Sequence, residues 1–533
     1  MSAVQSIEIK EGDKLMTDEK EAKYYRDKGV VERSGKTPQQ ALFSYKVLGV
    51  DPENIDRMIA EKAGTYEAEL ISQENRIEQE EAQLRNEVIM LLAQKHPDRD
   101  LASEKIVEYI MKNNHIYTVR DDKMPEIYMY EQGIYIPNGQ TRIEEIIRRI
   151  LQKAFRTQTC NDIVKKIMTD TYIDSDKFFT INYKEEIAVQ NGILNILTRE
   201  LKSFNPKKIF FNKCPVIYDK DSTCTVIDAF LSDVLAHPED RTVYYEIGGF
   251  SLLKEYTYEK AFMFVGNGRN GKGKSLELIK RVVGTENTIS LPLDALQHDN
   301  ADVSQLFTKM VNLAGDIGFQ DLKDTSMFKG LTGRDLVTAK RKYKLAVVFE
   351  NYAKFIFACN ELPRVYDMSA GFWDRWVLLE FPYYFADKEK WEQTSENDRK
   401  GWKIRDDNII DKIATPEQLS GLLNAFLDGL DRLVKKGKFS TTKGTEDVKN
   451  LWIRKSNSFM AFCMDSIEED YNAYITKKEL RNKFSKYCKL HKIKSASDKD
   501  IKVTLEIMFG TTENQRMVFN EIDRVWEGIK WKS

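Results

Sequence analysis

The stretch AFMFVGNGRNGKGKSLELIKRVV, residues 261–283, decides the fold of this chain. Five apolar residues predict a buried strand, the glycine-rich segment after them predicts a loop, and the following apolar positions recur at helical spacing. This order suits a phosphate group, because small residues let backbone N–H groups turn toward it and the helix N-terminus adds its dipole. A lysine beside the loop reaches the outer phosphate oxygens. The stretch therefore predicts a nucleotide-binding P-loop.

Two alignments of this loop remain open. In the first, residues 266–272 form GxxxxGK directly after the strand, which puts Gly273 where a Mg²⁺-binding hydroxyl is expected. In the second, residues 268–275 form a complete GxxxxGKS and Ser275 becomes the Mg²⁺ ligand, but two extra residues separate the motif from the strand. The spacing favours the first alignment. Together they give these candidate nucleotide-binding residues: Gly266, Asn267, Gly268, Arg269, Asn270, Gly271, Lys272, Gly273, Lys274 and Ser275.

Further apolar runs (MVNLAG, FIFACN, WVLLEF) follow, and they predict parallel strands joined by crossover helices. KMVNLAGD ends in Asp316, whose carboxylate is placed to hold Mg²⁺ and orient water. KFIFACN ends in Asn360, whose amide can hold the attacking water. The second acid usual at such a site is not adjacent to Asp316; Asp321 and Glu361 are candidates that the sequence leaves open. We expect Lys272, Asp316 and Asn360 to form one catalytic site.

Arginine and lysine side chains supply two further candidates. Arg375 lies between two tryptophans in GFWDRWVLLEF, and a guanidinium suits the charge that develops on a transferring phosphoryl group. A basic run between residues 340 and 344 predicts sequence-independent contacts with nucleic-acid phosphates. A second basic segment opens the helix-like TKKELRNKFSKYCKLHKIKS. The candidate DNA-binding residues are Lys329, Lys340, Arg341, Lys342, Lys344, Lys477, Lys478 and Arg481.

Composition sets the limits for the whole chain. A chain of 533 residues is too long for one hydrophobic core, and 41% hydrophobic residues with 31% charged ones are typical of globular proteins. The net charge of −2 excludes binding nucleic acid through overall charge, so any such contact must be local. Six scattered cysteines without a CxxC pair argue against a zinc site. Without a signal peptide or an apolar run of membrane-spanning length, we expect a cytoplasmic protein that contacts no membrane.

We expect four domains. Residues 1–99 form a mostly helical region of unclear role, with an amphipathic helix over about 66–95, and residues 100–250 form an α/β domain. Residues 251–440 hold the P-loop core, in which the charged stretch 386–407 is expected to be a surface loop. Residues 441–533 contain two helices and a strand pair in a pattern like a winged helix. The fold class is α/β.

The order of these motifs resembles the superfamily 3 helicase core, and is most similar to the primase-helicase proteins of phages, plasmids and large DNA viruses. The family's K-x-L-T-G-x-D segment reads here from Lys329 to Asp335. The resemblance extends to residues 188–219 before the core and 420–440 after it, and covers roughly residues 100–533. The first hundred residues are too short for the primase domain that family members often carry. We therefore expect a helicase portion without its own primase.

The resemblance implies an AAA+-like, ATP- and Mg²⁺-dependent DNA helicase that moves 3′ to 5′ as a hexamer during replication of a virus or plasmid in the host cytoplasm. It assigns nucleotide and Mg²⁺ roles to Lys272 and Asp316, a sensor role to Asn360, and a finger role across the subunit interface to Arg375. Single-stranded DNA would pass through a central channel and duplex DNA would meet the C-terminal domain. A separate primase or polymerase is the expected partner.

Two other readings remain. The chain can be a nucleotide-dependent switch or loader of replication proteins that unwinds nothing, which Gly273 and the missing second acid favour. It can also be an origin-binding module with a degenerate loop, which binds through its C-terminal domain. Hydrolysis stimulated by DNA separates the helicase from both.

Overall fold

Five parallel strands form the central sheet, in the order β14-β8-β13-β10-β9. They are β8 (Ala261–Val265), β9 (Thr288–Ile289), β10 (Val311–Ala314), β13 (Lys354–Cys359) and β14 (Trp376–Glu380). The apolar runs of the sequence are confirmed as strands of one parallel sheet, and β9 is an edge strand that the pattern did not predict. The computed structural model describes residues 77–180, 182–297, 303–315, 321–339, 346–491, 495–518 and 521–532.

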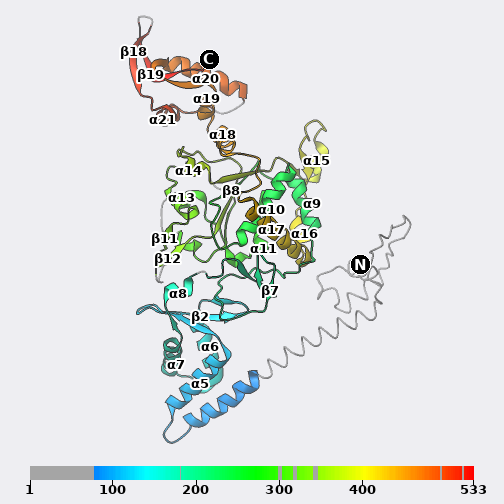
Figure 1. Cartoon of the computed structure of the whole chain (residues 1–533), viewed down its shortest axis with the longest axis vertical. Helices are drawn as coiled ribbons and strands as arrows, with labels where there is room; N and C mark the ends of the chain where they lie inside the picture. The colour runs from blue at the N-terminus through cyan, green and yellow to red at the C-terminus, as the bar shows by residue number, and fades with distance from the viewer. Residues whose placement is uncertain are drawn as a thin grey trace, which may run out of the picture. The chain divides into compact units, whose positions relative to one another are not determined.

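Helices cover this sheet and bury it. All residues of β8 and β13 are buried, as expected for central strands of a parallel sheet. Three of the helices, α10, α11 and α17, lie beside one another next to the sheet (Figure 1). The helices of this region are α9 (Thr225–Val234), α10 (Pro238–Leu252), α11 (Lys272–Val283), α13 (Ser326–Thr332), α14 (Ala370–Trp373), α16 (Ile409–Ile413) and α17 (Pro416–Lys436). Single turns of 3₁₀ helix are η2 (Thr285–Asn287), η3 (Leu293–Gln297) and η4 (Ser304–Leu306).

Glycines bring α10 and α17 into backbone contact. A Cβ added at Gly249 of α10 would lie 2.2 Å from the carbonyl oxygen of Phe426, and one added at Gly429 of α17 would lie 2.4 Å from that of Tyr245. Both distances are far below van der Waals contact, so no larger residue fits without moving a helix. Gly437 ends α17, because it caps the helix in the left-handed conformation with φ 68°.

The chain divides into two compact units, one of residues 1–110 with 144–163 and the other of residues 111–143 with 164–533. In the first unit, residues 77–92 are helical and α5 (Arg99–Asn113) follows, so the expected amphipathic helix is present where it can be seen. Its residues 66–76 lie outside the described ranges. Glu81 is buried in this unit and accepts three hydrogen bonds from Arg149, at 2.7, 2.8 and 3.1 Å. A buried carboxylate needs such a partner.

Two small sheets precede the central one in the chain. The first has the order β3-β2-β1-β4 and the second the order β5-β6-β7. Their strands are β1 (Ile116–Val119), β2 (Glu126–Glu131), β3 (Ile134–Ile136), β4 (Tyr172–Ile173), β5 (Glu186–Val189), β6 (Gly192–Asn195) and β7 (Leu201–Lys202). The helices among them are α6 (Gly139–Leu151), η1 (Gln152–Ala154), α7 (Thr157–Asp170) and α8 (Ser175–Phe179). The expected mixture of short strands and helices is therefore present in this region.

The stretch expected to be a surface loop, residues 386–407, is instead partly ordered into regular elements. It contains α15 (Lys388–Gln393) and β16 (Trp402–Ile404), and β16 pairs in parallel with β15 (Tyr384–Ala386). The rings of Tyr384 and Trp402 lie 4.9 Å apart, and the Lys390 ammonium lies 5.0 and 5.3 Å from them. These are contacts between segments, which apolar periodicity within one segment does not reveal.

The C-terminal residues form helices and an antiparallel sheet of order β17-β19-β18. Phe459, Phe484 and Trp526 are buried in its core. Glu479 N–H donates to Thr476 Oγ1 at 3.2 Å, which caps the helix that begins at Lys477. The elements are α18 (Thr445–Ser456), α19 (Ser458–Ser466), β17 (Ile467–Thr476), α20 (Lys477–His491), α21 (Asp498–Phe509), β18 (Glu513–Val518) and β19 (Glu521–Trp531). Within the described ranges, every helix is too short or too polar to cross a membrane.

Candidate functional site

The glycine-rich loop connects the end of β8 to the start of α11. Gly271 is the N-cap of α11 with φ 92°, and a Cβ there would lie 2.5 Å from Val234 Cγ1, so both backbone and space require glycine. A Cβ at Gly266 would lie 2.3 Å from Asn270 Nδ2. The Asn270 amide donates to the Phe381 carbonyl at 3.2 Å and thereby ties the loop to the residue after β14. The loop is thus held in one shape at the carboxyl edge of the sheet.

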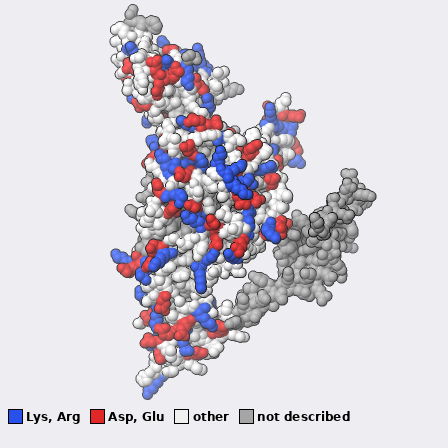
Figure 2. All heavy atoms as spheres, in the orientation of Figure 1, with Lys and Arg blue, Asp and Glu red and all other residues white. Residues whose placement is uncertain are grey.

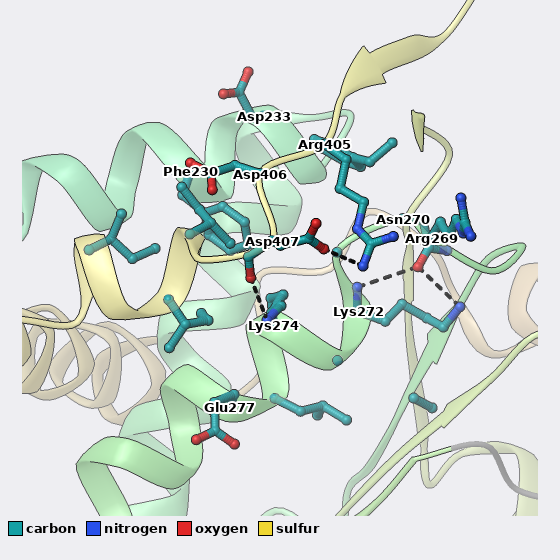
Figure 3. Close-up of a pocket in the computed structure, with 18 of the residues that line it drawn as sticks. Phe230, Asp233, Arg269, Asn270, Lys272, Lys274, Glu277, Arg405, Asp406 and Asp407 are labelled. Atoms are coloured by element: carbon teal, nitrogen blue, oxygen red, sulfur yellow. Dashed lines mark hydrogen bonds and ion pairs between the residues drawn. The ribbon is translucent and has the colours of Figure 1, made fainter. Parts of the chain in front are cut away.

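The two candidate lysines face different surroundings (Figure 3). Lys272, the first residue of α11, is 5% exposed, and its ammonium donates to Asn270 Oδ1 at 3.2 Å and to Asn360 Oδ1 at 3.1 Å. Lys274 is exposed, and its ammonium lies 3.4 Å from the Asp407 carbonyl oxygen. The structure therefore brings Lys272 and Asn360 together, although 88 positions separate them in the chain. Lys274 lies apart from them.

The two candidate Mg²⁺ ligands are Asp316 and Ser275. Asp316 lies outside the described residues, directly after Gly315, which lines the same cavity as Lys272. Ser275 is fully buried, and its hydroxyl donates to the Gly271 carbonyl at 3.1 Å. Around Gly273, no heavy atom of the described part lies within 4 Å of an added Cβ. A hydroxyl side chain at position 273 would therefore have room.

The two candidates for a second acid differ in their surroundings. Asp321 accepts a hydrogen bond from the Tyr366 hydroxyl at 3.1 Å. Glu361 is exposed and directly follows Asn360 at the end of β13. Of these two acids, only Glu361 is a sequence neighbour of a candidate site residue, Asn360.

Arg375 lies at the opposite edge of the sheet. It directly precedes β14, and Trp376 pairs with Ala261, the first residue of β8, whereas the glycine-rich loop follows the last residue of that strand. The Arg375 side chain is 15% exposed; its Nε donates to Thr332 Oγ1 at 2.8 Å and its Nη2 to Glu259 Oε2 at 3.2 Å. One chain therefore does not bring Arg375 to its own glycine-rich loop.

The candidate DNA-binding residues fall into three places. Lys340, Arg341, Lys342 and Lys344 lie outside the described residues, between the antiparallel strands β11 (Leu336–Ala339) and β12 (Val347–Glu350). Lys329 donates to Asp367 Oδ2 at 2.9 Å. Burial would raise the pKa of Asp367, but hydrogen bonds from Ser369, Thr325 and Lys329 outweigh it and lower that pKa.

In the C-terminal part, basic side chains pair with acidic ones. Lys477 Nζ lies 3.0 Å from Glu513 Oε1, and Arg481 forms an ion pair with Asp498. Lys478 is exposed. Across the face drawn in Figure 2, basic and acidic side chains are interspersed.

A cavity of about 1160 Å³ opens from the glycine-rich loop. Besides the loop it is lined by α9, by the start of α11, by residues 404–407 and by α16. Arg405 forms an ion pair with Asp407 (Figure 3). The Arg405 Nη1 also lies 3.2 Å from Asp387 Oδ1. Asp387 also accepts from Arg269 Nη1 at 2.8 Å, and this hydrogen bond lowers the pKa of Asp387.

The walls formed by α9, residues 404–407 and α16 were not predicted as part of the site. No motif marks them, since they come from segments 32 or more positions from the glycine-rich loop, and one was expected to be a surface loop. In α9 the buried apolar residues recur at helical spacing, a pattern that indicates a helix and not a ligand site.

Two family models match parts of the chain. Residues 57–236 match the family described as D5 N terminal like, and residues 264–375, which contain the loop, Asn360 and Arg375, match DUF5906, a family of unknown function. A protein of Acanthamoeba polyphaga mimivirus, named as a predicted helicase, is 23% identical over 269 residues. The match covers 46% of this chain and 26% of that relative, so the chain spans about a quarter of the relative's length.

Solved structures of the NrS-1 C-terminal region are also similar. Two apo forms have TM-scores of 0.42 and 0.44 at 13% identity, and the matches cover 79% of this chain and 98% of theirs. Scores at this level add no independent argument about the site. By the two family models and the viral relative, the chain is similar to proteins of the primase-helicase family of phages and viruses.

Proposed function

We propose that the chain is an ATP- and Mg²⁺-dependent DNA helicase of superfamily 3, which moves 3′ to 5′ as a hexameric ring during replication of a virus or plasmid. The observation that carries the proposal is the pairing of Lys272 with Asn360 at 3.1 Å, beside a glycine-rich loop that opens into a large cavity. The helicase name of the mimivirus relative supports the choice of activity.

In this proposal, residues 266–272 form the P-loop of an AAA+-like core. When ATP binds, the Lys272 ammonium exchanges its hydrogen bonds with the protein for oxygens of the outer phosphates, and backbone N–H groups at the start of α11 face the phosphate chain. Asn360 then holds the attacking water against the terminal phosphate. Mg²⁺, held by Asp316, would neutralise charge on the phosphates. Without a hydroxyl at position 273, we assign no protein ligand from α11 to the metal.

Arg375 acts on the nucleotide of a neighbouring subunit. In the proposed ring, the amino edge of one subunit's sheet lies against the carboxyl edge of the next, so the position of Arg375 suits this role. A guanidinium there stabilises the charge that develops in phosphoryl transfer. Thr332 and Glu259 hold the side chain until the neighbour's nucleotide binds.

Two surfaces contact DNA in this proposal. The basic residues between the antiparallel strands β11 and β12 grip phosphates of the single strand in the channel. The C-terminal elements α19, β17, α20, α21, β18 and β19 have the order of a winged helix, which would meet duplex DNA. Lys478 is the candidate phosphate contact there because it is exposed, whereas Lys477 and Arg481 pair with acids of the same domain.

The test compares ATP hydrolysis with and without single-stranded DNA in four proteins: wild type, Lys272→Ala, Lys274→Ala and Arg375→Ala. We expect DNA to stimulate the wild type, and we expect Lys272→Ala and Arg375→Ala to lower the rate at least a hundredfold, roughly the loss of one phosphate-stabilising group. Lys274→Ala, two residues from Lys272, is the matched control and should retain most of the rate. Hydrolysis that ignores DNA and survives Arg375→Ala would refute the ring helicase.

Gly273 favours one other function, a nucleotide-dependent switch or loader of replication proteins. A site without the hydroxyl can bind nucleotide yet hydrolyse it slowly. Gly273→Thr restores the hydroxyl, because the space around position 273 admits the side chain, and it should speed hydrolysis where the missing hydroxyl limits the rate. Unwinding by the unaltered protein supports the helicase, and nucleotide binding without unwinding supports the switch.

A further inference from the structure

The strands β11 and β12 form a two-stranded antiparallel sheet of their own, separate from the central sheet. On one face of this pair Val337 and Val347 are buried, whereas Leu336 and Val348 on the other face are 74% and 60% exposed. A lone pair of strands is at most marginally stable in water, so the position of this pair depends on what packs against it. The basic residues 340–344 connect the two strands in the chain. Whatever fixes the pair therefore fixes both ends of that basic segment.

Three phenylalanine rings, the aromatic column, connect β12 to α8. The ring centroid of Phe349 on β12 lies 5.4 Å from that of Phe307, and the centroid of Phe307 lies 5.0 Å from that of Phe179, the last residue of α8. Both pairs meet edge to face, an arrangement that aromatic rings prefer. Phe178, the residue before Phe179, is fully buried in the core of the first small sheet. The column therefore starts from a fixed base.

A buried amide holds the same segments of the core a few residues farther along. Asn212 is 4% exposed, and its Nδ2 donates to the Thr308 carbonyl at 2.6 Å and to Asn287 Oδ1 at 3.1 Å. Its Oδ1 accepts from the Tyr352 hydroxyl at 3.0 Å. Thr308 directly follows Phe307, and Tyr352 lies two residues after the end of β12. A buried amide with all of these partners favours one arrangement of the segments that it joins.

The column and the amide join two different parts of the chain. Phe179 and Asn212 lie before the core, within the residues that match the D5 N terminal like family. Their partners lie at the amino edge of the central sheet, because residues 307–308 precede β10 and residues 349–352 precede β13. Lys272 follows the carboxyl edge of the same sheet. Changes in the aromatic column therefore leave the residues around Lys272 in place.

We propose that Phe179 and Phe307 are positioning residues for DNA engagement. Through Phe349 they hold β11 and β12, and with them both ends of the segment 340–344, in the orientation in which its basic side chains meet single-stranded DNA. The two phenylalanines act through the strands and do not contact the DNA themselves. The role rests on the proposed helicase function and adds a task for the part of the chain that precedes the core.

The test measures ATP hydrolysis against the concentration of single-stranded DNA. Phe179→Leu and Phe307→Leu each remove one ring and keep an apolar side chain, at positions that are only half-buried. We expect each variant to raise the DNA concentration for half-maximal stimulation about three- to tenfold, and to leave the rate without DNA within about twofold of the wild type. In the double variant the two losses should not multiply, because both residues act through the same column.

Two further variants serve as controls. Phe179→Tyr keeps the ring, so it should retain the half-maximal DNA concentration of the wild type. Tyr172→Leu removes another half-buried ring before the core, in β4, where the Arg120 guanidinium lies 5.7 Å from the ring centroid. It should respond to DNA as the wild type does, since it lies outside the column.

The outcomes distinguish positioning from a purely structural role. A loss of folded protein lowers the rates with and without DNA in the same proportion and leaves the half-maximal DNA concentration unchanged, and that result would overturn the inference. A variant that matches the wild type in every rate would overturn it as well, while the helicase function stands. If the wild type neither binds single-stranded DNA nor responds to it, the proposed function fails first, and the positioning role fails with it.

Discussion

Lys272 and Lys274 are two residues apart on one helix, yet only one of them faces Asn360. Residues two apart on an α-helix project from nearly opposite sides, so the first turn of α11 can direct only one of these lysines toward the sheet. The sequence left both alignments open because the glycine patterns overlap. It also predicted that Lys272 and Asn360 would meet, since each follows a buried strand at the same edge of a parallel sheet.

A lysine that the sequence did not single out is buried near β5. Lys254 is 6% exposed; its ammonium donates to the Glu186 carbonyl at 3.1 Å and lies 4.3 Å from the centre of the Phe210 ring. Burial lowers the pKa of Lys254 to about 8, against smaller opposing effects of Cys214 and Glu186. The unfolded chain, in which the pKa is near 10.5, therefore binds more protons between these two values.

The free energy of unfolding should consequently rise with pH across this window. The unfolded state binds the extra proton, and this proton stabilises it less as the pH rises. From pH 7.5 to 9.5 we expect the wild type to gain about 2 kcal/mol over Lys254→Met. Denaturant midpoints and melting temperatures at the two pH values measure this gain. Lys478→Met, at an exposed site, is the control, and parallel pH profiles for wild type and Lys254→Met would contradict the prediction.

At the scale of elements, α10 and α17 depend on close backbone contact at Gly249 and Gly429. Because an added methyl at Gly249 meets the Phe426 carbonyl at 2.2 Å and the Leu430 nitrogen at 2.7 Å, backbone must move to admit it. We expect Gly249→Ala to lower the free energy of unfolding by about 1–3 kcal/mol. Gly371→Ala, where the nearest atom lies at 3.7 Å, should cost far less, and equal melting temperatures for both variants would contradict the argument.

The elements show what kind of information a sequence carries. Strands such as β8 and β13 were predicted because each is a run of consecutive apolar residues, which indicates a buried strand. The short strands β15 and β16 were not, because each has only three residues and exists through pairing with the other. The same limit explains why the cavity wall at residues 404–407 was missed. Its role depends on Asp387 and Arg269, which lie far from it in the chain.

At the scale of the whole molecule, net charge and chain length limit which functions can be assigned to the chain. A net charge of −2, interspersed over the face in Figure 2, leaves DNA binding to local clusters such as the residues between β11 and β12. The chain also spans only 26% of the mimivirus relative, so the activities of that longer protein extend to this one only as proposals. Net charge was sufficient to exclude one mode of binding, but it could not locate the clusters.

The separation of Lys272 and Arg375 across the sheet predicts that two inactive variants complement each other when they are mixed. The five residues of β8 put the two edges roughly 15 Å apart, so no single subunit supplies both groups to one nucleotide. Lys272→Ala and Arg375→Ala are each expected to be inactive, yet a mixture assembled from both should recover hydrolysis. With random assembly, about a quarter of the interfaces join an intact lysine to an intact arginine. A mixture as inactive as either parent would mean that each subunit works alone.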